Sequence, residues 1–173
     1  MSELDEAWEL ALAEAQSRAH AAGRRDIADY LSLKRRNDLL RRTGTDWLIN
    51  EFVLLAGEAN RSGAGIQLER HDEHRFSRGT DSMVGRQVTL RRGVRALTIE
   101  SGWPRTPKDG IVRGGGLACA NIKHFGRSRM NEELILVSSA TGSPQWLIVN
   151  DDDRRITLLE AHLHRHLSFL TQS

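Results

Sequence analysis

The stretch QVTLRRGVRALTIE, residues Gln87–Glu100, decides the fold that the sequence predicts. On both sides of Arg92 and Gly93, apolar residues alternate with polar ones, which is the period of two typical of a half-buried β-strand. The alternating apolar residues are Val88, Leu90, Leu97 and Ile99. Arg92-Gly93 supplies a tight turn between the two halves, so the stretch predicts an antiparallel hairpin.

Further strands are predicted on both sides of this hairpin. Ile66–Glu69 alternates in the same way, whereas Leu134–Val137 and Trp146–Val149 are short continuous apolar runs, typical of strands covered on both faces. The segment SSATGSP between these two runs predicts a second hairpin. Ile111–Phe125 is predicted to be a strand entered through glycines, and Ser101–Gly110, with two prolines and two glycines, is predicted to be a loop.

Helical spacing of apolar residues dominates the rest of the chain. Ser2, Asp26 and Thr45 are side chains that can cap helices, and Thr157 with Glu160 forms a capping-box pattern. The predicted helices run from Ser2 to near Gly23, from Asp26 to Leu40 before Gly44, from Asp46 to about Asn60, and from Leu158 to about Leu170. The helix after Thr45 offers tryptophan, phenylalanine and leucine where a DNA-recognition helix needs polar side chains, which excludes a helix-turn-helix motif.

Segregation of the helices and strands along the chain favours an α+β fold. We expect a single domain, 1–173, with a helical part at 1–62, a sheet at 64–150 and a C-terminal helix at 157–171. The antiparallel sheet should have five to seven strands packed against the N-terminal helices and the C-terminal helix. There is no repeated alternation of strand and helix, which excludes Rossmann-like and TIM-barrel folds.

Length and composition are those of a globular protein of 173 residues, 39% of them hydrophobic. The only cysteine, Cys119, cannot form an intramolecular disulfide, as is typical of a reducing compartment. The N-terminus is acidic and lacks the layout of a signal peptide, and no apolar run approaches the roughly 18 residues of a membrane helix. We therefore expect a cytoplasmic protein without a membrane or a cofactor among its partners.

Charge is concentrated in the middle of the chain. From Arg70 to Arg129 there are 13 Lys and Arg against 5 Asp and Glu, although the formal net charge of the whole chain is only +2. Such a region can attract nucleic acid or another polyanion, with Arg91, Arg92 and Arg95 as candidate contacts. A solvated sheet face with long arginines along its strand edges is the simpler interpretation, and we prefer it.

The glycine triplet before the predicted central strand is the first candidate site. Successive backbone N–H groups without neighbouring Cβ atoms can bind an anion. A phosphate loop would need a helix behind it and the Walker lysine, and both are missing, so a β-bulge or a close approach of backbones is the preferred interpretation. The ligand-binding candidates of this region are Arg105, Arg113, Gly114, Gly115, Gly116, Lys123 and His124.

Catalytic and metal-binding constellations are incomplete. Cys119 and His124, five residues apart on one strand, should point to opposite faces and lie roughly 16 Å apart, so we assign no catalytic residue. His162 and His166 share a helix face and are weak metal candidates, although histidines bordering a leucine stripe explain the pattern better. The acidic triple at 151–153 lacks the alternation of a calcium loop and is predicted to be a turn.

These observations favour a non-enzymatic binding or interaction module, with a basic sheet face and the glycine-rich loop as its recognition surface. An acidic partner or nucleic acid would suit that surface, and the alanine-rich first helix leaves a homodimer open. One alternative is a nucleic-acid-binding protein that uses the arginine-rich middle. The other is a small-molecule enzyme or sensor with a pocket between the sheet and the helices.

Overall fold

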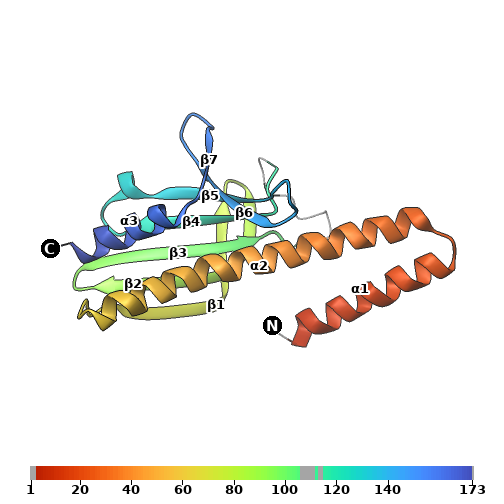
Figure 1. The fold of residues 1–173 in the computed structure, drawn as a ribbon, viewed down its shortest axis with the longest axis horizontal. Coiled ribbons are helices and arrows are strands. Elements are labelled where there is room, and N and C mark those ends of the chain that lie inside the picture. Colours follow the sequence, from red (N-terminus) through yellow and green to blue (C-terminus); the bar gives the residue numbers. More distant parts are fainter. Residues whose placement is uncertain (1–2, 106–111, 113–114, 173) are drawn as a thin grey trace. The chain divides into compact units, whose positions relative to one another are not determined.

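A computed structural model describes residues 3–105, 112 and 115–172, and the chain divides into two compact units, Met1–Leu40 and Arg41–Ser173. The first unit contains helix α1 (Glu3–Ala21) and the beginning of helix α2 (Arg25–Arg61), which continues into the second unit (Figure 1). The first unit thus falls within the helical part predicted for residues 1–62.

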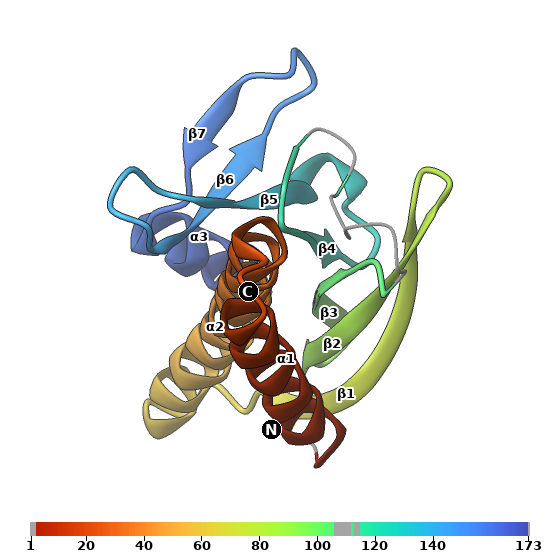
Figure 2. The same cartoon turned by 90° about the vertical axis from the view of Figure 1, so that its right-hand side faces the viewer.

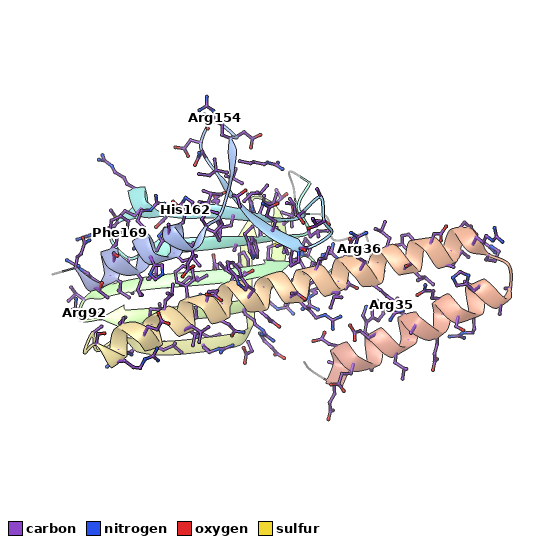
Figure 3. All side chains as sticks on the ribbon, viewed as in Figure 1. Arg35, Arg36, Arg92, Arg154, His162 and Phe169 are labelled. Carbon is purple, nitrogen blue, oxygen red and sulfur yellow. The ribbon has the colours of Figure 1, made fainter. Side chains whose placement is uncertain are left out.

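The first unit is a helical hairpin. Gly23 makes the turn between the two helices with a positive φ of 71°. Small and apolar side chains are buried in this unit, namely Leu12, Ala19, Ala28 and Leu40. Polar contacts join the same two helices: the Lys34 ammonium lies 5.2 Å from the centroid of the Trp8 ring, and Arg35, labelled in Figure 3, donates to the Gln16 side chain at 3.0 Å.

Helix α2 is continuous over 37 residues, so the predicted break at Gly44 is wrong. Gly44 is instead a packing position. A Cβ there would come within 2.7 Å of the Leu136 side chain, and the Gly44 carbonyl accepts a hydrogen bond of 2.9 Å from Nε1 of Trp146. The hydroxyl of Thr45 is hydrogen-bonded to that of Ser101 at 3.2 Å rather than capping a helix. Despite this length, neither α2 nor any other described helix is apolar enough to cross a membrane.

The second unit contains a seven-stranded antiparallel sheet in which every strand pairs with the next one along the chain. The strands are β1 (Gln67–Arg78), β2 (Asp81–Arg92), β3 (Arg95–Trp103), β4 (Ala118–His124), β5 (Glu132–Ser138), β6 (Pro144–Val149) and β7 (Arg155–Thr157). A 3-10 turn, η1 (Ser128–Met130), lies between β4 and β5, and helix α3 (Glu160–Thr171) follows β7. The predicted α+β class with an antiparallel sheet is confirmed.

Both predicted hairpins are present, β2–β3 and β5–β6, with Gly93 at positive φ in the turn of the first. Four details of the sheet differ from the prediction. The strand predicted at Ile111–Phe125 begins only at Ala118, as β4, and Gly115 before it lies in a turn. Strand β1 continues through polar residues to Arg78, with a bulge between His71 and His74, where no period of two is visible in the sequence. Strand β3 extends to Trp103, into the predicted loop, and β7 was not predicted at all.

One face of the sheet is covered by the later turns of α2 and by α3 (Figure 2). Between the sheet and the two helices lies the main hydrophobic core, which includes Trp103, as its even spacing from Leu97 and Ile99 predicts. The helical side chains of this core are Leu48, Ile49, Phe52, Leu55 and Ala56 from α2 and Leu163, Leu167 and Leu170 from α3.

Both ends of α3 are held by contacts that the sequence does not reveal. At its start, Nδ1 of His162 accepts a hydrogen bond of 2.9 Å from the Leu159 N–H, in place of the predicted capping box at Thr157. At its end, the guanidinium groups of Arg92, labelled in Figure 3, and of Arg95 donate to carbonyl oxygens of the last turn and of Gln172. Positive charge at a helix C-terminus is favourable because the last carbonyls carry partial negative charge.

The backbones of β2 and β3 approach each other closely at Gly85 and Gly102, which are direct cross-strand neighbours. A Cβ on Gly85 would lie 1.8 Å from the Ser101 carbonyl oxygen, and a Cβ on Gly102 would lie 2.6 Å from the Val84 oxygen. Only glycine therefore fits at either of these two positions.

We expect Gly85→Ala to destabilise the protein by roughly 1–3 kcal/mol or more, because backbone atoms must move to admit the methyl group. The matched control is Gly57→Ala on α2, where a Cβ meets nothing within 4 Å. This control should stabilise the protein by about 0.5–1 kcal/mol through its higher helix propensity. Urea denaturation of the three proteins measures both effects; equal stabilities would contradict the close approach.

Candidate functional site

The face of the second unit's sheet opposite α3, here called the open face, is divided into an apolar end and a polar part. At the apolar end lies a small cluster of Met83, Val112 and Cys119 with Phe76 packed against it. Arg78 at the end of β1 reaches β5, where it donates to the Leu134 carbonyl oxygen at 3.1 Å and lies 3.4 Å from a Glu133 carboxylate oxygen. The sheet therefore curls over this end of its own open face.

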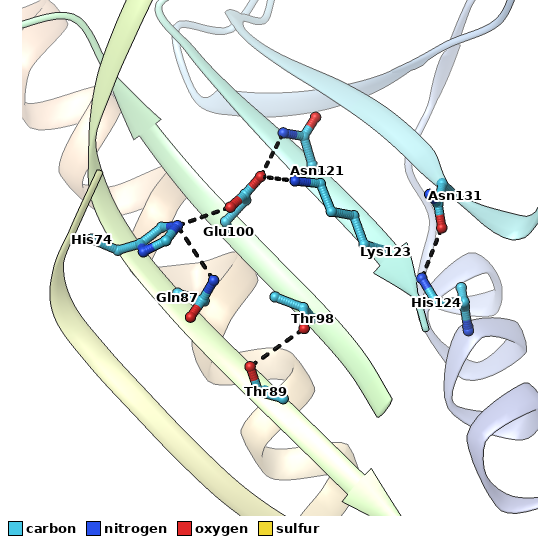
Figure 4. Close-up of polar contacts among 9 residues, drawn as sticks. All are labelled: His74, Gln87, Thr89, Thr98, Glu100, Asn121, Lys123, His124 and Asn131. Atoms are coloured by element: carbon cyan, nitrogen blue, oxygen red, sulfur yellow. Dashed lines mark hydrogen bonds and ion pairs between the residues drawn. The ribbon is translucent and has the colours of Figure 1, made fainter. Parts of the chain in front are cut away.

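At the border of the apolar end, Glu100 of β3 is the centre of a polar network (Figure 4). One carboxylate oxygen accepts from the Lys123 ammonium at 2.5 Å and from the Asn121 amide at 2.9 Å. The other oxygen accepts from Nε2 of His74 at 2.8 Å. Glu100 is only 4% exposed, so a carboxylate almost excluded from water joins residues of β1, β3 and β4.

The charge of Glu100 is stabilised by its neighbours. Burial alone would raise its pKa, because a carboxylate loses hydration when it is covered. Hydrogen bonds from Lys123, Asn121 and His74, together with the positive charge of Lys123, outweigh that effect and hold the pKa of Glu100 below its usual value. The carboxylate is therefore ionised at neutral pH and fixes the three donors around it.

The sheet register explains how these residues meet. Gln87, Glu100 and Asn121 lie in one row across β2, β3 and β4, whereas His74 belongs to the neighbouring row, opposite Gly85. Gly85 in turn lies opposite Gly102 of β3. Because neither glycine has a side chain, nothing stands between the His74 imidazole and Glu100. The Gln87 amide lies 3.3 Å from the same imidazole nitrogen, and the Phe76 ring stacks on the imidazole with a centroid distance of 5.8 Å.

The outer groups of the network remain accessible. The Lys123 side chain is 50% exposed and that of His74 is 22% exposed, although both are hydrogen-bonded to Glu100. An ammonium group has three N–H donors, so Lys123 can serve a further acceptor while Glu100 holds it in place. Beside Lys123, the hydroxyls of Thr89 and Thr98 lie 3.4 Å apart. The arrangement is suited to hydrogen-bonding a polar molecule laid on the open face.

The sequence-predicted ligand candidates are distributed over different surroundings. Lys123 and His124 are neighbours in β4 but lie on opposite faces, with Lys123 in the Glu100 network and His124 buried beside α3. The Arg105 guanidinium lies 4.2 Å from the centroid of the Trp103 ring. Arg113 and Gly114 lie outside the described residues.

The two described glycines of the triplet have structural surroundings. Gly115 has a φ of 85° and its N–H donates to the Val112 carbonyl oxygen at 2.9 Å, which forms a tight turn. A Cβ on Gly116 would lie 2.2 Å from the Ile135 side chain. The nearest neighbour of Gly116 is thus a side chain and not the second backbone expected from the sequence, and Gly115 lies in a turn.

Of the three arginines predicted to contact nucleic acid, only Arg91 is exposed on the open face. Arg92 and Arg95 bind the C-terminal carbonyl oxygens of α3 on the other face. These three side chains therefore do not form one continuous basic surface.

The cysteine and the histidines have surroundings that the spacing only partly predicts. Cys119 and His124 do face opposite sides of the sheet, and burial raises the pKa of the Cys119 thiol although Arg78 opposes this. His162 binds the Leu159 N–H, whereas both ring nitrogens of His166 are hydrogen-bonded to other side chains. Within residues 3–105, 112 and 115–172, no group of three or more His, Cys, Asp or Glu is placed to hold a metal ion.

Two central residues of the network, Glu100 and Asn121, were not singled out from the sequence. Glu100 occupies a polar position in an alternating strand, where exposure is the ordinary expectation. The only local signal is Gly102, two residues later on the same face, since glycine inside a strand indicates a close approach of another backbone. The partners His74 and Asn121 come from other strands, and one sequence does not reveal that register.

Comparison of the chain with protein-family models, with curated proteins and with solved structures finds no match. Function is therefore argued from the geometry around Glu100 alone.

We expect Glu100→Gln to destabilise the protein by about 1.5–3 kcal/mol at pH 7, the range for hydrogen bonds to a charged group. Because the pKa of Glu100 in the folded protein lies below its usual value of 4.5, the stabilisation by its charge is full above pH 4.5 and is lost as the pH falls through the folded pKa. The difference between wild type and variant should therefore shrink towards pH 3. Urea denaturation at several pH values measures it, and Glu58→Gln, whose side chain is 60% exposed, is the control. A difference that does not change with pH would contradict a stabilising charge at Glu100.

Proposed function

We propose that this chain is a binding protein whose recognition surface is the open face of the sheet around Lys123, and that its partner is acidic. The observation that carries the proposal is the buried Glu100 carboxylate, which holds Lys123 and His74 in fixed positions while their outer parts stay exposed. The proposal narrows the recognition surface expected from the sequence to one group of residues and omits the glycine-rich loop.

A buried carboxylate is an expensive way to stabilise a sheet, since replacing a buried ion pair by apolar groups is often neutral or stabilising. Exposed polar side chains without a buried partner would be sufficient for a face in contact with water. What Glu100 adds is orientation: side chains that are held in place before binding lose less conformational entropy when a partner arrives. This supports a binding role rather than a purely structural one.

The charge of the exposed side chains favours an acidic partner. Lys123 carries a positive charge, and a second cation, Arg91, lies one row further along the same face. The negative charge of Glu100 is buried beneath them and already satisfied by three donors. A carboxylate-bearing partner would thus meet N–H donors first.

The two alternatives have less support. The nucleic-acid interpretation needs Arg92 and Arg95 as phosphate contacts, but both guanidinium groups are hydrogen-bonded to the end of α3. The interpretation of an enzyme or sensor needs a pocket between the sheet and the helices, and that layer is occupied by the packed side chains of the main core.

A titration of the ¹⁵N-labelled chain with an acidic peptide, hexaglutamate, tests the proposal. We expect shifts of the backbone signals of Lys123, Asn121 and Thr98 at low ionic strength, and weaker binding as salt screens the charges. Lys123→Glu should lower the affinity at least tenfold, because it removes a donor and adds a like charge. Arg154→Glu is the matched control, since Arg154 is 80% exposed in the turn between β6 and β7, well away from the network (Figure 3).

A second titration with a single-stranded oligonucleotide of the same net charge separates the alternatives. Shifts that appear only with the oligonucleotide and centre on Arg91 would support the nucleic-acid interpretation instead. No shift on the open face with either probe, or equal affinities for Lys123→Glu and wild type, would contradict the proposal.

A further inference from the structure

On the helix side of the sheet, two buried histidines and one partly buried glutamate form a hydrogen-bonded series of side chains that the open face does not use. Nε2 of His124 lies 2.8 Å from Nδ1 of His166, and Nε2 of His166 lies 2.9 Å from a Glu132 carboxylate oxygen. His124 is 7% exposed and His166 is 1% exposed. These three side chains join α3 to the end of β4 and the start of β5.

The contact between the two imidazoles has room for one hydrogen only. When both rings are neutral, Nε2–H of His166 donates to Glu132 and Nδ1 of His166 accepts from Nε2–H of His124, so every contact is satisfied. When both rings are cations, every ring nitrogen carries a hydrogen, and two N–H groups face each other across 2.8 Å. The doubly protonated state is therefore incompatible with the observed packing.

Charged groups of both signs surround these three side chains. Glu132 also binds Arg165 of α3 and is influenced by His162 on the same helix. Arg127, in the turn after β4, repels a charge on His124. The Phe52 ring of α2 contacts His166 and the Phe169 ring of α3 contacts His124, and neither ring carries a charge.

These surroundings lower the affinity of His124 for a proton. Burial, the neighbouring His166 and Arg127 together lower the pKa of His124 to about 4, against a partial opposing effect of Glu132. In an unfolded or undocked chain, His124 would bind that proton with its usual pKa of 6.5. Between these two values the undocked chain binds more protons than the docked one, so the docked state weakens as the pH falls.

We propose that His124, His166 and Glu132 form an acid-sensitive latch that docks α3 on the sheet at neutral pH and releases it in acid. The ligand of this site is the proton. The main core and the bonds from Arg92 and Arg95 also hold α3 on the sheet. Protonation must overcome their contribution before the helix is released.

Hydrogen exchange of the full chain tests the latch through the amides of Leu163 and Leu167 in α3. Their protection factors, corrected for intrinsic exchange, should fall by about tenfold for each pH unit between pH 6.5 and pH 4, as expected for uptake of one proton on opening. His124→Gln keeps an N–H donor towards His166 but cannot be protonated, so its pH dependence should be flatter over the same range.

The matched control is His164→Gln on the outer face of α3, where the imidazole is 52% exposed and contacts Glu160. This variant should keep the wild-type slope. Equal slopes in wild type, His124→Gln and His164→Gln, or wild-type protection that does not change with pH, would overturn the proposal.

A second measurement remains decisive if His124→Gln does not fold. The ring carbon and nitrogen shifts of wild-type His124, followed by NMR from pH 8 to pH 4, should show a neutral imidazole at pH 6. Titration of His124 with a midpoint near 6.5 in the folded protein would overturn the latch.

Discussion

The close approach of β2 and β3 at Gly85 and Gly102 is the constraint on which the second unit depends. With backbone atoms of the two strands so near each other, the sheet curls, and Arg78 at the end of β1 can reach β5. The same missing side chains leave the path from His74 to Glu100 free. One pair of glycines thus permits both the small apolar cluster on the open face and the polar network beside it.

The two polar clusters of the unit each contain a carboxylate, buried at Glu100 and partly buried at Glu132, and they differ in which elements bind it. Glu100 is surrounded by donors from neighbouring strands, so its charge is stabilised within the sheet itself. Glu132 is bound by His166 and Arg165 from α3, so its bonds connect the sheet to a helix. Consequently, the first cluster fixes side chains on one surface, whereas the second makes helix docking depend on protonation. Lys123 and His124, adjacent in β4, belong to one cluster each.

The period of hydrophobic residues was sufficient to predict the fold class, the β2–β3 and β5–β6 hairpins and the burial of Trp103. It failed where tertiary contacts overrule local preference. Gly44 costs a helix about 1 kcal/mol, yet its contacts with Leu136 and Trp146 keep α2 continuous. The polar residues of β1 form a strand because β2 supplies the partner. His124 and His166 are 42 residues apart, a separation from which no pairing can be inferred, and Glu100 resembles any exposed strand residue until its register is known.

The order of the sheet follows the order of the chain without a single crossover. Each ladder can therefore form as soon as the next strand is available, beginning from the short turn at Gly93. Such a sheet closes mainly small loops, which lowers the entropy lost before contacts begin to compensate for it. Antiparallel sheets that pair distant segments fold slowly for that reason. The meander should allow strands to add one after another, with the packing of α2 and α3 against the completed sheet as the later, long-range step.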